Sequence, residues 1–164
     1  MKILFTGFEP FDGGTSNPSY ACLRELPPTI GTAELVTMEL PVSFRRAPEL
    51  LLKGMDAEGP DAVICLGLAA NRKKISLEKV GLNYAYARIP DNDGMQPRDI
   101  PLDPSGPAAC FSTLPVWDLA AELNQAEIPA EVSLSAGSYV CNCLLYHLLR
   151  AAGRMPACFI HVPP

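Results

Sequence analysis

The segment from Ser133 to His147 places a cysteine where a strand is expected to change into a helix. Small residues that suit a turn precede Cys141, and Gly137 allows the backbone to turn and to approach a substrate closely. A helix that begins at Cys141 directs unpaired N–H groups and the positive end of its dipole toward the sulfur, which stabilises a thiolate. The same N–H groups can receive an oxyanion. The pattern therefore predicts that Cys141 is a nucleophile.

The alternative is that Cys141 is an unreactive core residue, because free cysteine is among the most buried residue types. Its position at the start of a helix favours the catalytic interpretation. Cys143 is expected to pack in the interior, since a separation of two residues turns it roughly 200° around the helix from Cys141. The other four of the six cysteines lie among apolar or small residues without paired spacing, as reduced core cysteines do: Cys22, Cys65, Cys110 and Cys158.

A cysteine nucleophile needs a base, and the chain has only two histidines. His147 would lie about 240° around the same helix from Cys141 and roughly 9 Å along it, which is poor geometry for a hydrogen bond to the sulfur. We expect it to be a surface or interface histidine. His161 lies at the end of an apolar run, and the C-terminal ends of strands in open α/β sheets are where sites gather. We therefore predict that His161 is the base, with a satisfied core histidine as the alternative.

Glu78 is a candidate for the group that orients the imidazole. It shares the polar side of an expected strand with Ser76, while Ile75 and Leu77 alternate with them. A carboxylate there could stabilise the imidazolium, as the third member of a nucleophile–base–orienter chain does. The alternative is a solvated surface pair with the neighbouring Lys79.

Short β-rich runs alternate with segments of helical character around these residues, which predicts an α/β fold. Helices are expected to begin at Asn17-Pro18, at Ser43 and after Pro115, and a further one is expected from near Cys141 to Ala152, closed by Gly153. Strands are expected at residues 3–6, 34–40, 61–66, 75–83, 131–135 and 158–162. Residues 88–115 are too rich in proline for a regular helix or a central strand, so we expect a long ordered loop or flap there.

The composition, 48% hydrophobic and 19% charged over 164 residues, favours one globular domain, residues 1–164. A formal net charge of -5 and scattered basic residues form no stripe for nucleic acid. The first apolar run is too short for a signal peptide, and no stretch approaches the roughly 20 apolar residues that span a bilayer. We expect a soluble, cytoplasmic protein that binds neither nucleic acid nor a membrane. Cysteine and histidine spacing does not match a zinc finger, so no structural metal is expected.

Taken together, the segments that carry chemistry resemble the pyroglutamyl peptidase I family, also called pyrrolidone-carboxylate peptidases. Residues 67–83 are similar to the family's glutamate signature, residues 133–146 to its cysteine signature and residues 159–163 to its histidine segment. Residues 6–19 resemble the family's first loop, and residues 88–92 match a further stretch. The similarity runs from the first strand to the last residue.

The resemblance implies a triad of Cys141, His161 and Glu78 that removes N-terminal 5-oxoproline from peptides with no metal or organic cofactor. It also implies that Phe8 and Phe11 sandwich the lactam ring, and a flat, uncharged lactam does suit aromatic faces. The other implied substrate contacts are Arg88 beside the oxyanion, Ile89 in the pocket wall, and Tyr139 and Val140 of the cysteine signature.

The same resemblance implies a three-layer α/β/α sandwich with a mixed central sheet, of the phosphorylase/hydrolase type, and a homo-oligomer, commonly a tetramer. Relatives continue past the histidine segment into a final helix, so the domain is expected to lack that C-terminal helix. A catalytically impaired relative that only binds 5-oxoproline is therefore an alternative to a peptidase. A phosphorylase that uses the glycine-rich first loop for phosphate is a third interpretation, but it leaves Cys141 without a role.

Overall fold

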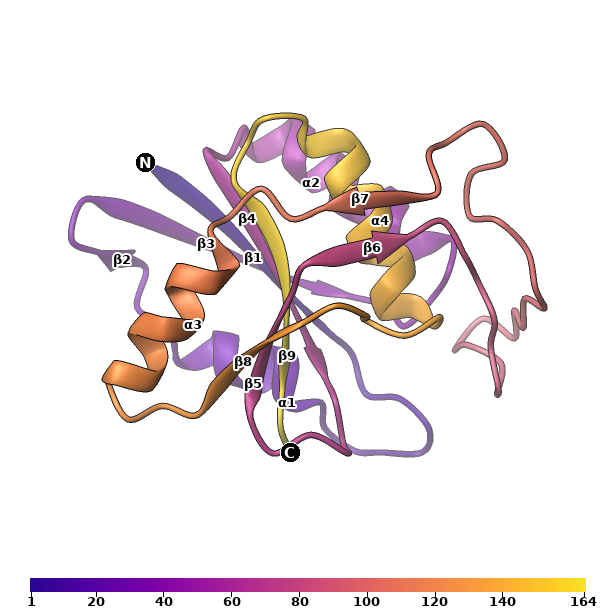
Figure 1. Cartoon of the computed structure of the whole chain (residues 1–164), viewed down its shortest axis with the longest axis horizontal. Coiled ribbons are helices and arrows are strands. Elements are labelled where there is room, and N and C mark those ends of the chain that lie inside the picture. The colour runs from indigo at the N-terminus through magenta and orange to yellow at the C-terminus, as the bar shows by residue number, and fades with distance from the viewer.

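The computed structural model describes all residues 1–164 and is built around a mixed sheet of seven strands (Figure 1). Their spatial order is β2 (Thr29–Ile30), β3 (Ala33–Leu40), β1 (Lys2–Phe8), β4 (Ala62–Leu68), β9 (Ala157–Val162), β5 (Ile75–Glu78) and β8 (Ala130–Ser133). Strands β3, β1, β4 and β9 are mutually parallel, whereas β5 runs antiparallel to β9 and parallel to β8, and β2 runs antiparallel to β3. The α/β class with a mixed sheet, as expected from the sequence, is confirmed.

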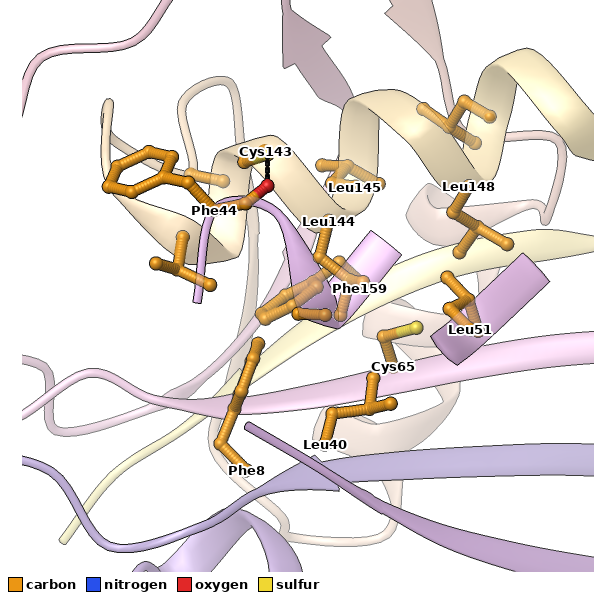
Figure 2. Packing of buried hydrophobic residues seen from close by; sticks show 14 of the residues in the cluster. Phe8, Leu40, Phe44, Leu51, Cys65, Cys143, Leu144, Leu145, Leu148 and Phe159 are labelled. Atoms are coloured by element: carbon orange, nitrogen blue, oxygen red, sulfur yellow. Dashed lines mark hydrogen bonds between the residues drawn. The ribbon is translucent and has the colours of Figure 1, made fainter. Parts of the chain in front are cut away.

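Helices cover both faces of this sheet. On one face, α2 (Arg46–Glu58) and α4 (Val140–Ala152) contribute to the main core, in which Leu51 and Leu144 pack with Phe159 (Figure 2). On the other face, α3 (Val116–Gln125) covers a smaller core of Leu77, Val116, Ala120, Ala130 and Cys158. The short α1 (Pro18–Ala21), followed by the 3-10 helix η1 (Cys22–Glu25), also lies on this second face. None of the helices combines the length and apolar character needed to cross a membrane.

The helix ends follow the local signals in the sequence, with one shift. Asn17 caps α1, since its Oδ1 accepts a hydrogen bond from the Ser19 N–H at 3.1 Å. Gly153 ends α4 with a φ of 58°, a conformation that glycine adopts without strain. Helix α2 begins at Arg46 rather than at Ser43, and the Ser43 hydroxyl instead accepts a hydrogen bond from the Arg46 N–H at 3.0 Å.

The prediction of a single strand at residues 75–83 is wrong, because the chain leaves the main sheet at Lys79. Strand β5 ends at Glu78, and β6 (Val80–Leu82) pairs with β7 (Ala109–Phe111) in a separate two-stranded sheet. Gly81 makes this departure possible, since a Cβ there would lie 3.0 Å from the Tyr146 backbone nitrogen of α4. Strand β6 therefore packs directly against the helix that carries Cys141.

The proline-rich segment 88–115 is a long loop, as expected, except that β7 forms near its end. Asp91 is buried within it and accepts hydrogen bonds from the backbone N–H groups of Phe44 and Met95, both at 2.8 Å. Asn92 Nδ2 donates to Glu9 Oε1 at 2.8 Å, which ties this loop to the first loop of the chain. The segment therefore rests on the ends of β1 and β3.

The cysteines are less uniformly buried than the sequence suggested. Cys65 and Cys158 are fully buried as expected, but Cys110 is half-buried and Cys22 is exposed, so the core assignment of Cys22 is wrong. Cys143 packs in the main core and donates a hydrogen bond to the Phe44 carbonyl oxygen at 3.3 Å (Figure 2).

Candidate active site

Cys141 lies over the C-terminal ends of the parallel strands β4 and β9. It is the second residue of α4, and its Sγ is 3.1 Å from the position that a Cβ of Gly67 would occupy. Gly67 pairs with His161 in the register of β4 and β9. The fold therefore brings the thiol and the imidazole to the same edge of the sheet, where sites in α/β proteins gather.

Gly67 leaves the space that the thiol needs. A Cβ at this position would approach Phe159 Cζ to 2.5 Å and Cys141 Sγ to 3.1 Å. We expect the Gly67→Ala variant to lose about 1–3 kcal/mol of stability through overpacking and to be less active, because the sulfur must move. Urea unfolding together with steady-state activity checks this, and an unchanged midpoint with full activity would contradict it.

His161 is joined to Glu78 below the surface. His161 is 5% exposed, Glu78 is 0% exposed, and His161 Nδ1 lies 2.7 Å from Glu78 Oε1. Although Glu78 pairs with Phe159 in the antiparallel register of β5 and β9, its side chain reaches the diagonal neighbour His161. The alternative interpretation of Glu78 as half of a solvated surface pair with Lys79 is therefore wrong. Lys79 Nζ instead donates to the Ser112 carbonyl oxygen at 2.9 Å.

The electrostatics of these groups favour charged forms. Burial lowers the pKa of His161, but the hydrogen bond and charge of Cys141, and then those of Glu78, outweigh burial and raise it to about 9. Burial raises the pKa of the Glu78 carboxyl, whereas the hydrogen bond from His161, the nearby Ser133 hydroxyl and the charges of His161 and Arg72 bring it below its ordinary value. An imidazolium held between a carboxylate and a sulfur is thus the favoured state at neutral pH.

The raised pKa of His161 predicts how stability depends on pH. Between its ordinary value of 6.5 and about 9, the folded protein keeps a proton that the unfolded chain has lost, so the free energy of unfolding contributed by His161 falls as pH rises. The other histidine does not act in this window, because burial lowers the pKa of His147. An NMR titration of the His161 imidazole isolates this contribution: its midpoint should lie near pH 9 in the wild type and at lower pH in Cys141→Ala. Equal midpoints in the two proteins would contradict the assignment.

The start of α4 is open toward the site and firmly anchored. No side chain caps the helix at Tyr139, and the backbone N–H groups of Val140 and Cys141 donate to no protein acceptor. The buried Asn142 side chain accepts from the Leu82 N–H at 2.9 Å and donates to the Leu82 and Tyr84 carbonyl oxygens at 2.9 and 3.0 Å. The helix end can therefore direct donors at an oxyanion from a fixed position.

An apolar cavity of about 410 Å³ opens beside the thiol. Phe8 is buried in its wall, and Phe11 packs on Tyr139 with ring centroids 5.4 Å apart. The sequence-predicted residues that line this cavity are Phe8, Phe11, Tyr139, Val140 and Cys141. Its dimensions and mostly uncharged walls suit a small, flat, neutral group.

Arg88 and Ile89 lie around a second hollow of about 250 Å³. This hollow shares Phe11 and Tyr139 with the cavity beside the thiol, so the two are neighbours. The structure thus gathers five of the predicted site residues around the first cavity and places Arg88 and Ile89 around the adjoining one.

His147 is not part of this arrangement. It is half-buried and lines a cavity of about 110 Å³ beneath the proline-rich loop together with Cys143, so the expected surface or interface position stays a prediction. No group of three or more His, Cys, Asp or Glu side chains in the chain is placed to hold a metal ion.

The chain is similar to known proteins over its whole length. The family model described as pyroglutamyl peptidase matches residues 1–164. The chain belongs to the pyroglutamyl peptidase family. Among curated relatives, the pyrrolidone-carboxylate peptidase 1 of Caldanaerobacter subterraneus subsp. tengcongensis is 43% identical over 99% of this chain and 82% of its own length. A pyrrolidone-carboxylate peptidase of Streptococcus pyogenes is 42% identical over 99% of this chain and 78% of its own length.

Solved structures of pyroglutamyl peptidases have the same fold. The Pyrococcus furiosus pyrrolidone carboxyl peptidase superposes with a TM-score of 0.96 at 41% identity, covering 100% of this chain and 81% of that one. The Bacillus amyloliquefaciens pyroglutamyl peptidase I superposes with a TM-score of 0.96 at 38% identity, covering 99% of this chain and 80% of that one.

Three further residues of the site in this pyroglutamyl peptidase family member were not predicted from the sequence. Arg72 contacts Glu78 directly, Asn142 anchors the helix of Cys141, and Gly67 provides space for the sulfur. Arg72 and Gly67 lie in the glutamate signature and Asn142 follows the nucleophile, so their proximity in sequence was the available signal. Nothing in the sequence alone indicates which of their neighbours they contact.

Proposed function

We propose that this protein is a cysteine exopeptidase that removes N-terminal pyroglutamate, 5-oxoproline, from peptides. Membership of the pyroglutamyl peptidase family supports the reaction class. The observation that carries the proposal is that the Cys141 thiol, the His161 imidazole and the buried Glu78 carboxylate lie together beside an apolar cavity. Cys141 is the proposed nucleophile, His161 the acid and base, and Glu78 the group that orients and stabilises the imidazolium.

In the acylation step, the Cys141 thiolate attacks the carbonyl carbon between 5-oxoproline and the next residue. A carbon–sulfur bond forms and the carbonyl oxygen becomes an oxyanion, which accepts hydrogen bonds from the free N–H groups of Val140 and Cys141. The carbon–nitrogen bond then breaks as the His161 imidazolium gives its proton to the leaving amine. Arg88 is the proposed additional contact of the oxyanion.

In the deacylation step, the neutral His161 takes a proton from water, which attacks the thioester carbonyl. The carbon–sulfur bond breaks, 5-oxoproline leaves, and the thiolate and imidazolium are restored. Glu78 stays ionised throughout, because the hydrogen bonds and positive charges around it oppose its protonation.

Phe8 and Phe11 are the proposed contacts for the two faces of the lactam, with Ile89, Tyr139 and Val140 completing the walls. Phe11 is only half-buried, so Phe11→Ala should leave the fold intact while removing one stacking face. We expect kcat/KM to fall by about 10- to 100-fold, mainly through KM. The control is Phe111→Ala, which removes an exposed phenylalanine of β7. Equal kinetics of the two variants would rule out the stacking role.

The proposed function is tested with a fluorogenic pyroglutamyl amide and its prolyl counterpart, in which a CH₂ group replaces the lactam carbonyl and the ring nitrogen is a basic amine. Release from the pyroglutamyl amide only is the expected result. The opposite outcome is saturable binding of 5-oxoproline with no release at micromolar enzyme, which would establish a binding protein in place of an enzyme.

Three finer statements belong to the same proposal. Residues 1–164 form one domain, supported by the packing of both cores against one sheet. The protein is a homo-oligomer, a tetramer by family resemblance, which light scattering measures. It acts in the cytoplasm on pyroglutamylated peptides, which cell fractionation tests.

A further inference from the structure

Arg72 connects the buried carboxylate of the site to the turn that precedes the nucleophile. Its Nη1 donates to Glu78 Oε1 at 2.7 Å, and its Nη2 donates to the Ser135 carbonyl oxygen at 3.0 Å. Ser135 lies between the end of β8 and the start of α4, five residues after Ala130 and six before Cys141. One side chain therefore contacts both the strand of the carboxylate and the approach to the helix of the thiol.

The backbone around Arg72 is fixed to the strand of His161. The Arg72 N–H donates to the Ala69 carbonyl oxygen at 2.9 Å, which closes the turn after β4. The Ala69 N–H donates to the Val162 carbonyl oxygen at 3.0 Å, next to His161. The guanidinium thus projects from a turn that is held against β9, and its position relative to His161 is determined by short backbone links.

The positive charge of Arg72 stabilises the ionised form of the buried Glu78 carboxylate. The carboxylate is 0% exposed. Its Oε1 accepts hydrogen bonds from His161 Nδ1 and Arg72 Nη1, each at 2.7 Å, while Oε2 has no hydrogen-bond partner. A carboxylate removed from water in this way becomes protonated unless opposite charges face it. The groups that face it are His161 from β9, Arg72 from the turn after β4 and the hydroxyl of Ser133 from β8, and Cys141 of α4 acts on it only through His161.

We propose that Arg72 is a positioning residue of the site: it keeps Glu78 ionised and aligned on His161 Nδ1, and so maintains the reactive pair of His161 with the Cys141 sulfur. Arg72 contacts neither the thiol nor the cavity beside it, so it acts through Glu78. The catalytic part of this inference rests on the proposed function, whereas the effect on the thiol can be measured without any substrate.

The test follows the alkylation rate of Cys141 by iodoacetamide against pH, read by peptide mass analysis so that the exposed Cys22 does not interfere. In Arg72→Met, Glu78 should take up its proton at higher pH, and the acid limb of the Cys141 alkylation profile should move up by about one pH unit. The loss of kcat should be about tenfold on the acid side and smaller on the alkaline side, with KM within about twofold of the wild type. Arg72→Lys keeps a positive charge and should restore most of the acid limb.

Two further variants separate charge from folding. Arg72→Gln keeps a donor for the Ser135 carbonyl but has no charge, so its acid limb should match that of Arg72→Met, and it replaces that variant if Arg72→Met does not fold. Lys73→Met removes the exposed neighbouring cation and should leave the profile unchanged. An acid limb that stays in place in the uncharged variants, or that moves equally in Arg72→Lys, would overturn the inference. A wild type that does not cleave the pyroglutamyl amide would instead count against the proposed function, since the alkylation profile still reports on Arg72.

Discussion

Replacement of Cys141 by alanine is expected to lower kcat by about 10⁶-fold, because no other nucleophile in the cavity is paired with His161. The sulfur is half-buried at the first turn of α4, and it faces Gly67 and His161. An alanine methyl group fits the same space, so the free energy of unfolding near pH 6.5 should change little. Steady-state turnover of the pyroglutamyl amide, with urea unfolding on the same preparation, measures both quantities.

The matched control for this variant is Cys143→Ser, two residues further along the same helix. Cys143 faces the core and donates to the Phe44 carbonyl oxygen, a bond that a serine hydroxyl can replace. Its turnover should stay within about threefold of the wild type, while its stability falls because a hydroxyl replaces a buried thiol. If Cys141→Ala retained turnover, or if the two variants lost it equally, Cys141 would not be the nucleophile.

The second large effect is expected for Glu78→Gln, which should lower kcat by about 10⁴-fold. The amide preserves the size of the side chain but removes the charge that stabilises the His161 imidazolium and pairs with Arg72. The pKa of His161 should therefore fall below its value of about 9 in the wild type, and with it the alkaline limit of activity. A pH profile of kcat and a histidine titration followed by NMR measure the two changes.

Glu131→Gln provides the comparison for the Glu78 variant. Glu131 lies on β8, accepts a hydrogen bond from the Ser76 hydroxyl and is exposed, so its charge is screened by water. This variant should keep wild-type kinetics. Retention of kcat within about tenfold in Glu78→Gln would remove Glu78 from the catalytic group.

The sequence predicted most of the elements that position the site, since their signals are local. A helix from near Cys141 to Ala152 is confirmed within one residue at its start, because an apolar face and a terminal glycine specify it. The strand at residues 158–162 is confirmed with an extra residue at its start, and its alternation places Phe159 and His161 on the same side as α4. The choice between His147 and His161 needed only helix geometry, and only His161 lies beside Cys141.

The remaining features depend on contacts between distant segments, which local patterns do not encode. The break at Lys79 was missed because residues 75–83 continue to alternate, while the chain turns away to pack Gly81 on α4. The exposure of Glu78 was left open for the same reason, since its burial depends on the antiparallel neighbour β9. Arg72 reads as one of several surface cations until Glu78 and Ser135 are known to lie within its reach.

The departure of β6 from the main sheet bears on how this chain can vary over evolution. Glu78 and Leu82 are four residues apart, and Asn142 clamps Leu82 through both its N–H and its carbonyl, directly after Cys141. The distance in space between the Glu78 carboxylate and the Cys141 thiol therefore depends on this short stretch, although the two residues are far apart in the chain. A change of length in the later part of the long loop, at residues 93–108, would leave that distance unaltered. A single inserted residue between Glu78 and Leu82 would turn the carboxylate or the clamp to the wrong face, so the site requires a fixed length there.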